Sequence, residues 1–391
     1  MTELLLVKYG EIALRGKNRP IYENMLAATI RKVAAKAGKY FVKKEQGRLL
    51  VEPVYGEPVD YATLVPLLQN VFGIVAICPG LKSEDQSLDA LKEMALAHMQ
   101  AQYGDTPITF KVETKRAVKK YPMLSQEVSA AVGEYLLDNM PNLTVNVQKP
   151  DVVLNLELRT DAYAFSKIIR GPGGLPFGSA GKAVLLLSGG LDSPVAGYYA
   201  AKRGLEVQAV YFHSPPYTSE RAKEKVLDLA ERLSLFIGKV ELFVVPFTEV
   251  QLKIVESTPP EKTTILLKRA MLHIANRIAK ETGALALVTG DSVGQVASQT
   301  LHSLAAVNSA ATLPILRPLC CMDKIEIIHV AERIGTYDIS IRPYDDCCTL
   351  FLPEHPETKP KAGIIENVER QFKDYDELLD AAAANRERVL F

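Results

Sequence analysis

Residues 184–193 read Val-Leu-Leu-Leu-Ser-Gly-Gly-Leu-Asp-Ser. The apolar first part of this stretch is typical of a buried strand in a parallel sheet. Gly189 and Gly190 then turn the chain with little bulk, so backbone N–H groups can approach an anion closely. A helix is expected from about Asp192 to Arg203, and its N-terminus adds a partial positive charge. The stretch predicts a phosphate-binding loop that is not of the Walker A type, because no Gly-Lys-Ser/Thr follows.

The segment from Ser188 to Ser193 resembles the PP-loop of the ATP pyrophosphatases. This resemblance implies an enzyme that splits ATP into AMP and pyrophosphate and adenylates an oxygen of a second substrate. The surrounding half of the chain alternates strands and helices, as a doubly wound parallel sheet does. We expect strands at 183–188, 206–212, 239–246 and 284–290, and helices at 192–203, 218–234, 260–282 and 323–334.

The ATP site is predicted at the carboxyl ends of these strands, where such sheets bind ligands. Asp192 is a candidate catalytic residue, suited to bind Mg²⁺ or to fix the loop, with a plain helix N-terminal acid as the alternative. Lys268 and Arg269 are suited to stabilise the leaving pyrophosphate, with a solvated pair as the alternative. The polar segment 289–300 is a candidate site loop. The residues predicted to bind ATP are Leu186, Leu187, Ser188, Gly189, Gly190, Ser193, Tyr211, Phe212, Lys268, Arg269, Gly290 and Gln299.

Composition and charge indicate an ordinary globular protein with a basic N-terminal end. The 391 residues are 48% hydrophobic and 24% charged, with a net charge of zero, and this length allows two or three domains. The sequence has no secretory leader pattern and no apolar run long enough to span a bilayer, so we expect a cytoplasmic location.

The first fifty residues contain eleven Lys and Arg but four Glu. This imbalance indicates a polyanionic partner, with a solvated basic face as the alternative.

The N-terminal half contains two smaller α/β regions. Residues 1–57 are expected to form a ferredoxin-like domain with strands at 3–8 and 47–53, and an amphipathic helix at 20–37 with Ile21, Met25, Ile30 and Val33 on one side. Residues 58–170 are expected to contain strands near 106–116, 144–148, 152–158 and 162–169 and a helix near 123–139.

Three segments of this second region, 110–116, 149–151 and 169–176, together resemble a THUMP domain. The resemblance implies tRNA binding, for which the candidate residues are Arg15, Lys17, Arg19, Lys115 and Arg116. A glycine-rich linker is expected at 171–182, followed by the PP-loop domain at 183–391.

The five cysteines include two adjacent pairs, Cys320-Cys321 and Cys347-Cys348, which do not resemble a disulfide framework. Adjacent residues rarely direct both sulfurs at one metal, which disfavours a zinc or iron–sulfur site. We expect a reactive thiol in Cys347-Cys348, with inert packing as the alternative, although the preceding pair of Asp would raise a thiol pKa. Cys78 lies in an apolar run and is expected in the core.

In this order, the segments resemble the tRNA 4-thiouridine synthetases over essentially the whole chain, including residues 9–19, 213–216 and 294–300. The resemblance implies that ATP adenylates O4 of uridine eight in tRNA and that persulfide sulfur from a cysteine desulfurase then displaces AMP. The catalytic cysteine of the family falls at Cys347 or Cys348. The sequence leaves open whether the protein has a second role in thiazole synthesis and whether it forms a homodimer.

The longest members of that family carry a C-terminal rhodanese-like domain with a persulfide cysteine. Here a short helical tail is expected after Lys361, so the second thiol of the relay would come from a partner or from another cysteine. Two other interpretations are a different PP-loop enzyme, such as a 2-thiouridylase or a nucleotide amidotransferase, and a non-catalytic tRNA-binding sulfur carrier. The THUMP-like half and the absence of a glutaminase domain disfavour the first, and the intact loop disfavours the second.

Overall fold

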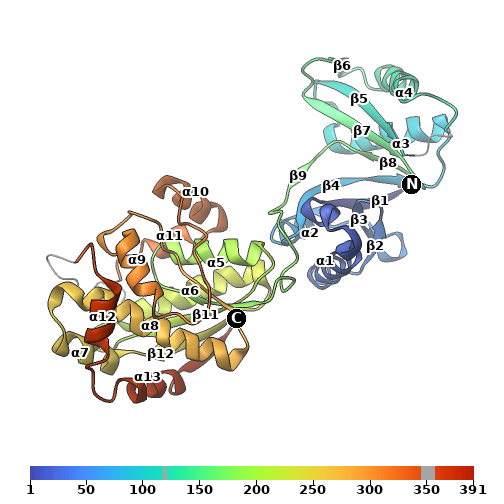
Figure 1. The fold of residues 1–391 in the computed structure, drawn as a ribbon. Coiled ribbons are helices and arrows are strands. Elements are labelled where there is room, and N and C mark those ends of the chain that lie inside the picture. The colour runs from blue at the N-terminus through green and yellow to red at the C-terminus, as the bar shows by residue number, and fades with distance from the viewer. Residues whose placement is uncertain (118–120, 345–356) are drawn as a thin grey trace. The chain divides into compact units, whose positions relative to one another are not determined.

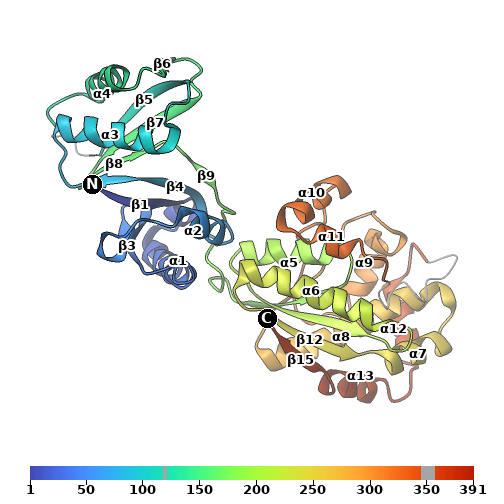
Figure 2. The ribbon, with the colours of Figure 1, turned by 180° about the vertical axis from the view of Figure 1, so that it is seen from behind.

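The computed structural model describes residues 1–117, 121–344 and 357–391. It consists of two compact units, Met1–Gly174 and Leu175–Phe391. Each unit is a β-sheet covered by helices (Figures 1 and 2). This confirms the predicted α/β class for both halves of the chain.

The N-terminal unit contains one mixed sheet of nine strands, in the order β2-β3-β1-β4-β8-β7-β5-β6, with β9 paired to β4. Its strands are β1 (Thr2–Tyr9), β2 (Tyr40–Glu45), β3 (Arg48–Pro53), β4 (Ile74–Ser83), β5 (Ile108–Arg116), β6 (Leu143–Val145), β7 (Val152–Leu158), β8 (Ala162–Phe165) and β9 (Ile169–Arg170). Its helices are η1 (Glu11–Leu14), η2 (Gly16–Asn18), α1 (Arg19–Ala34), η3 (Val54–Gly56), α2 (Tyr61–Leu68), α3 (Leu88–Tyr103) and α4 (Ser125–Asn139).

The long strand β4 joins the two halves of this sheet. It runs antiparallel to β1 along nearly its whole length, and its last four residues pair with β8. β4 follows the domain boundary expected at residue 57, yet its main partner is the first strand of the chain. We refer to β1–β3 with α1 and α2 as the first half, and to β5–β8 with α3 and α4 as the second half.

The buried face of α1 differs from the predicted one. Leu26, Ala27, Ile30 and Ala34 are buried, whereas Ile21 is exposed. Ile21 lies in the first turn of α1, so the apolar stripe begins one turn later than the sequence pattern predicts.

The C-terminal unit contains a six-stranded sheet in the order β14-β13-β10-β11-β12-β15. Its strands are β10 (Lys182–Leu186), β11 (Glu206–His213), β12 (Glu241–Pro246), β13 (Ala286–Val288), β14 (Ile315–Leu316) and β15 (Glu387–Leu390). Its helices are α5 (Asp192–Lys202), α6 (Glu220–Ile237), α7 (Thr248–Ser257), α8 (Pro260–Thr282), η4 (Ala297–Gln299), α9 (Leu301–Asn308), α10 (Lys324–Ile334), α11 (Tyr337–Ser340), α12 (Ala362–Glu369) and α13 (Tyr375–Ala384).

Strands β10 to β14 are all parallel, which confirms the doubly wound sheet. Helices α5 and α6 cover one face of the sheet and α8 and α13 the other (Figures 1 and 2). The neighbours of β10 are β11 on one side and β13 on the other, so the strand order reverses at β10. Ligands of such sheets bind at the carboxyl end of this switch point.

The segment after Lys361 is more than the helical tail expected from the sequence. Besides α12 and α13 it contains β15, which pairs antiparallel with β12 at the edge of the sheet. Backbone hydrogen bonds between Val240 and Phe391 extend this pairing by one residue. The end of the chain therefore covers an edge that would otherwise be open.

The glycine-rich segment between the units is bonded to both of them. Gly171 and Gly173 donate backbone hydrogen bonds to the start of β4, within the N-terminal unit. Leu175 donates to the end of α5, within the C-terminal unit. A Cβ on Gly171 would come 2.4 Å from a carbonyl oxygen of β4, so this position requires glycine. Throughout the residues described above, every helix is too short or too polar to cross a membrane.

Candidate functional site

A cavity of about 210 Å³ opens at the carboxyl ends of β10, β11 and β13. One part of its wall is apolar and the other carries hydroxyl, carboxylate and cationic groups, which suits a ligand with a flat apolar part and a charged part. The cavity is lined by Leu186, Leu187, Ser188, Asp192, Ser193, Tyr211, Phe212, Lys268, Met271, Leu272, Thr289, Gly290, Asp291, Gln299, Val307 and Arg317.

The PP-loop between β10 and α5 is held in shape by two hydroxyl groups. The backbone N–H of Ser188 donates to Oγ of Ser193 at 2.8 Å, and the two hydroxyl oxygens are 3.0 Å apart. Leu191 is at the N-cap position of α5 and has no side-chain oxygen with which to cap the helix. The amino end of α5, with its partial positive charge, is therefore available to an anion at the loop.

Asp192 is the first residue of α5 and faces the cavity. Its carboxylate accepts hydrogen bonds from Nζ of Lys324 at 2.7 Å and from Nε2 of Gln295 at 2.9 Å. Lys324 begins α10 and Gln295 lies in the predicted site loop. Asp192 thus joins three segments that are far apart in the sequence around one end of the cavity.

A second carboxylate, Asp291, lies between two cations. Lys268 Nζ and Arg317 Nε each lie 3.5 Å from one of its oxygens, and Thr289 donates a hydrogen bond at 2.8 Å. Burial alone would raise the pKa of Asp291, but Lys268, Thr289 and Arg317 together hold this pKa below its ordinary value. Asp291 therefore stays ionised and keeps both cations directed at the cavity.

Two polar groups in the cavity wall have no partner in the described part of the chain. They are the amide oxygen of Gln299 and Nη2 of Arg317, both of which are buried. Buried groups of this kind are usually satisfied by a ligand or by water. Nη2 of Arg317 is a cationic donor suited to phosphate oxygens.

Most residues predicted to bind ATP are brought together by the fold. Asp192 and nine of the twelve line the cavity, and Gly189, Gly190 and Arg269 do not. Gly189 and Gly190 are part of the loop itself, where only their backbone could contact a ligand.

Arg269 does not line the cavity, contrary to the predicted contact with ATP. Its guanidinium donates to Glu369 at 2.6 and 3.1 Å and to Ala306 and Ser309 at 2.6 Å. The side chain is 3% exposed, so this arginine holds α8 against α9 and α12. The reason is helical geometry, because successive side chains on a helix point about 100° apart.

Several cavity residues were not identified from the sequence. Arg317 follows β14, at the strand exit expected before Cys320, but was not given a role. Gln295 and Asp291 lie within the predicted site loop but were not singled out, and Lys324 carries no motif that marks it. The apolar wall formed by Met271, Leu272 and Val307 comes from helices whose pattern indicates only a core.

Gly290 allows the loop after β13 to lie directly against the PP-loop helix. A Cβ at this position would lie 2.7 Å from the backbone nitrogen of Ser193 and 2.8 Å from the carbonyl carbon of Asp192. These are backbone atoms, so the contact cannot be relieved by turning a side chain. The Gly290→Ala variant is expected to lose about 1–3 kcal/mol of stability and to bind ATP more weakly, as measured by thermal unfolding and calorimetry.

The matched control for this variant is Gly363→Ala in α12. A Cβ on Gly363 meets no atom within 4 Å, and alanine is the better helix former. We expect that control to bind ATP like the wild type. Equal ATP affinity in the Gly290→Ala variant would show that the close approach is not needed for the site.

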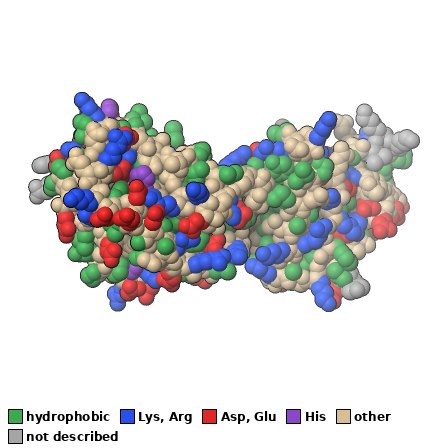
Figure 3. Space-filling view, turned by 60° about the horizontal axis from the view of Figure 1, so that its bottom comes forward, with side chains coloured by type: hydrophobic (Ala, Val, Ile, Leu, Met, Phe, Trp, Pro, Cys, Tyr) green, Lys and Arg blue, Asp and Glu red, His purple; other side chains and the backbone are tan. Residues whose placement is uncertain are grey.

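The candidate RNA-binding residues near the N-terminus form local ion pairs. Arg15 pairs with Glu11 at 2.7 Å and Arg19 pairs with Glu23 at 2.6 Å, while Lys17 is exposed. At least five of the eleven basic residues in the first fifty pair with carboxylates. The residue count therefore overstates the free positive charge. Figure 3 shows Lys and Arg side chains spread over the visible face of this unit rather than in one block.

The two candidates at the end of β5 differ in their surroundings. Lys115 is exposed. Arg116 donates to the carbonyl oxygens of Tyr121 and Met123 and to the hydroxyl of Ser125. Arg116 thus holds the residues that lead into α4, and Lys115 is the freer of the two for a phosphate contact.

The cysteines occupy three different settings. Cys78 is buried, and its burial raises the pKa of its thiol to about 11, so it is an inert core residue as predicted. Cys320 and Cys321 lie on the loop before α10 with their sulfur atoms 3.6 Å apart. The predicted catalytic residues Cys347 and Cys348 lie outside the described residues.

The residues that precede and follow the part of the chain containing Cys347 and Cys348 are held by other elements of the C-terminal unit. The buried Lys225 of α6 donates to the carbonyl oxygens of Arg342 and Tyr344 at 2.9 and 3.3 Å. After the segment, the backbone N–H of Glu357 donates to the carbonyl oxygen of Glu261 at 3.0 Å. The hydroxyl of Ser340, just upstream, donates to the carbonyl oxygen of Gly190 in the PP-loop at 3.2 Å.

Three family models match consecutive parts of the chain. Residues 4–78 match the ThiI ferredoxin-like domain, residues 85–166 match the THUMP domain, and residues 178–373 match the Thiamine biosynthesis protein (ThiI). The order of these matches agrees with the order predicted from the sequence, and the first match extends beyond residue 57 into β4.

Full-length relatives are similar along the whole chain. A protein of Lachnoclostridium phytofermentans named "Probable tRNA sulfurtransferase" is 48% identical over 100% of this chain and 99% of its own length. A protein of Acetivibrio thermocellus with the same name is 49% identical over 99% and 98% of the two chains. A crystal structure of a 4-thiouridine synthetase–RNA complex with bound ATP is 39% identical, covers both chains completely and superimposes with a TM-score of 0.91.

Proposed function

Since the chain belongs to the tRNA sulfurtransferase family, we propose that it is an ATP-dependent enzyme that converts uridine eight of tRNA to 4-thiouridine. The observation that carries this proposal is the cavity at the switch point of the sheet. A PP-loop, the Asp192–Lys324 pair and the cations Lys268 and Arg317 converge there. The related solved structure contains both ATP and RNA, which supports the same two ligands here.

The proposed reaction has two steps. Uracil O4 first bonds to the α-phosphorus of ATP and pyrophosphate leaves. A persulfide sulfur then attacks C4, and AMP leaves with the former O4, because adenylation has turned a poor leaving group into a good one. The transferred sulfur is then bonded both to C4 and to the first cysteine. A second thiol attacks the sulfur of that cysteine, the S–S bond to the transferred sulfur breaks, and 4-thiouridine is released while the two thiols remain as a disulfide. We propose a cysteine desulfurase as the source of the persulfide, and sulfur transfer for thiazole synthesis as an additional role.

The cavity residues have separable roles in the first step. Leu186, Phe212 and Met271 offer an apolar surface to the adenine ring. The PP-loop and the amino end of α5 hold the phosphates through backbone N–H groups. Lys268 and Arg317 stabilise the charge that develops on the leaving pyrophosphate, since cations aimed at such charge lower the barrier.

Magnesium fits this arrangement through Asp192. One carboxylate together with phosphate oxygens is the kind of ligand set that Mg²⁺ prefers, and Asp192 faces the cavity. When bound, Mg²⁺ would neutralise phosphate charge.

The N-terminal unit is proposed to bind tRNA through its exposed basic residues. A fragment of residues 1–174, one compact unit, is expected to bind tRNA on its own. Its affinity should fall by orders of magnitude between about 50 and 200 mM salt, because phosphate contacts release counterions. The measurement is filter binding of labelled tRNA across a salt series.

Two charge-reversal variants sharpen this experiment. Lys17→Glu/Lys115→Glu should weaken binding and flatten the salt dependence, because each exposed lysine is a candidate phosphate contact. Lys32→Glu makes the same kind of change at an exposed position of α1 that was not predicted to bind tRNA. Equal losses in both variants would indicate general attraction rather than a defined surface, and no binding at low salt would refute the proposal for this unit.

A further inference from the structure

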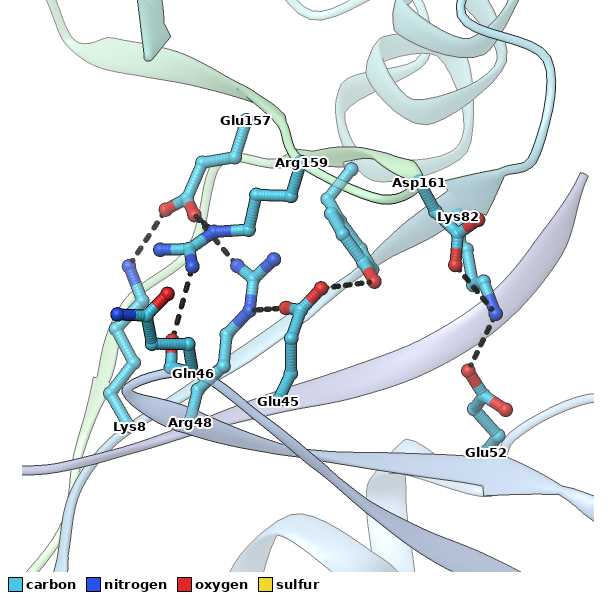
Figure 4. Close-up of polar contacts among 10 residues, drawn as sticks. Lys8, Glu45, Gln46, Arg48, Glu52, Lys82, Glu157, Arg159 and Asp161 are labelled. Atoms are coloured by element: carbon cyan, nitrogen blue, oxygen red, sulfur yellow. Dashed lines mark hydrogen bonds and ion pairs between the residues drawn. The ribbon is translucent and has the colours of Figure 1, made fainter. Parts of the chain in front are cut away.

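The two halves of the N-terminal unit meet along a seam with an apolar centre and charged ends. Leu4, Leu6 and Leu50 of the first half pack against Tyr163 and Phe165 of the second. Figure 4 shows the charged side chains, which project from both halves into the space between them. The term charged seam is used below for Lys8, Glu45, Arg48, Glu52, Lys82, Glu157, Arg159 and Asp161.

Arg48 and Glu157 form the centre of one end of the charged seam. Nη1 of Arg48 in β3 donates to Glu157 in β7 at 2.7 Å, and the two side chains are 2% and 8% exposed. Glu157 also accepts hydrogen bonds from Lys8 and Arg159, each at 3.3 Å. Arg48 pairs with Glu45 as well, and its guanidinium lies 4.2 Å over the ring of Tyr163.

Lys82 forms the centre of the other end. This residue of β4 donates to Glu52 of the first half and to Asp161 of the second half, both at 3.1 Å. Lys43 adds a second cation to Glu52 at 2.5 Å. Each end of the seam therefore joins residues of both halves through a charge that is largely shielded from water.

Stability alone does not account for charges in this position. Transferring charged groups from water into a protein is costly, and apolar residues of similar size often stabilise a fold equally well or better. Burial raises the pKa of Glu157, but Arg48 and Lys8 more than offset this, so its pKa is held below the ordinary value and it stays ionised at neutral pH. Unlike an apolar contact, an ion pair with fixed hydrogen bonds allows one alignment of its two partners.

We propose that the charged seam positions the two halves for RNA, so that the first half and the second half contact one tRNA as a single rigid body. This inference rests on the proposed tRNA binding, in which Lys17 belongs to the first half and Lys115 to the second. When two contact surfaces are held at a fixed separation, the second contact costs little additional entropy. Salt does not screen buried pairs strongly, so this alignment persists when salt weakens phosphate contacts.

The test replaces one end of the seam by apolar side chains in the full-length protein. Arg48→Met/Glu157→Leu removes one positive and one negative charge, and its melting temperature is expected to match or exceed that of the wild type. The affinity for full-length tRNA should fall by about tenfold, because the two halves are then held less rigidly relative to each other. Spin labels at Lys32→Cys and Asp138→Cys, in a background with Cys320, Cys321, Cys347 and Cys348 changed to Ser, should give a broader distance distribution.

The control is Lys111→Met/Glu113→Gln, which removes an ion pair of 2.6 Å that lies wholly within β5. That variant should keep the narrow distance distribution. An unchanged distribution or unchanged tRNA affinity in Arg48→Met/Glu157→Leu would overturn the inference. If that variant does not fold, Lys82→Met/Asp161→Asn applies the same measurements to the other end. A wild-type protein that binds no tRNA would instead refute the proposed function, and the distance distribution would still report on the seam.

Discussion

Replacing Asp192 by Ala is expected to reduce tRNA-dependent release of pyrophosphate by at least about 100-fold, because the cation that this carboxylate would hold stabilises transition-state charge, and losing such stabilisation usually has an effect of this size. Asp192 is the carboxylate that joins the PP-loop helix to Lys324 and Gln295. Without it, Lys324 loses its partner at the cavity and the proposed Mg²⁺ loses its protein ligand. The measurement is the rate of pyrophosphate release with saturating ATP and tRNA.

Glu220→Ala provides the matched control for this variant. Like Asp192, Glu220 is the acidic first residue of a helix that packs on the sheet of the C-terminal unit. It is exposed and does not line the cavity. The control should retain full activity, and tRNA affinity should be unchanged in both variants. Pyrophosphate release at the wild-type rate in Asp192→Ala would remove this residue from the proposed mechanism.

Replacing both Cys347 and Cys348 by Ser is expected to abolish formation of 4-thiouridine when a cysteine desulfurase supplies the sulfur. Adenylation needs the PP-loop cavity rather than a thiol, so pyrophosphate release should continue in the same preparation. The two products measured together separate the two steps. Recovery of thiolation with inorganic sulfide would locate the defect in sulfur delivery.

The second adjacent pair serves as the comparison for this prediction. Cys320→Ser/Cys321→Ser should retain adenylation, and its effect on thiolation reports whether the second thiol of the relay comes from this chain or from a partner. The hydrogen bond between the two thiols is the main reason that the pKa of Cys320 is raised, so this pair is poorly suited to supply the first nucleophile. Normal thiolation in Cys347→Ser/Cys348→Ser with desulfurase as the donor would reduce both cysteines to structural residues.

The nucleotide loop could be predicted from sequence because its features are contiguous. The ten residues 184–193 contain the end of an apolar strand, two glycines and the acidic first residue of a helix. The parallel sheet follows from the same kind of local evidence, repeated along the second half of the chain. β15 was missed because a strand of four residues is too short to show an alternation of apolar and polar residues.

The charge of the N-terminal end illustrates the opposite case. Eleven basic residues against four acids indicate a strongly basic surface. In the fold, Arg48 and Lys8 pair with Glu157, a residue from more than a hundred positions away. A count within one segment cannot include partners that the fold brings from another.

The sequence by itself determined the class of both units, the phosphate-binding loop and the position of the cavity at the carboxyl ends of the strands, since these depend on local patterns and on general rules of parallel sheets. Tertiary structure decided which cations serve the cavity. Lys268 faces it and Arg269 does not, because neighbours on a helix point in different directions. Arg317 and Lys324 reach Asp291 and Asp192 only through folding, because each contact joins side chains from elements that no local pattern relates.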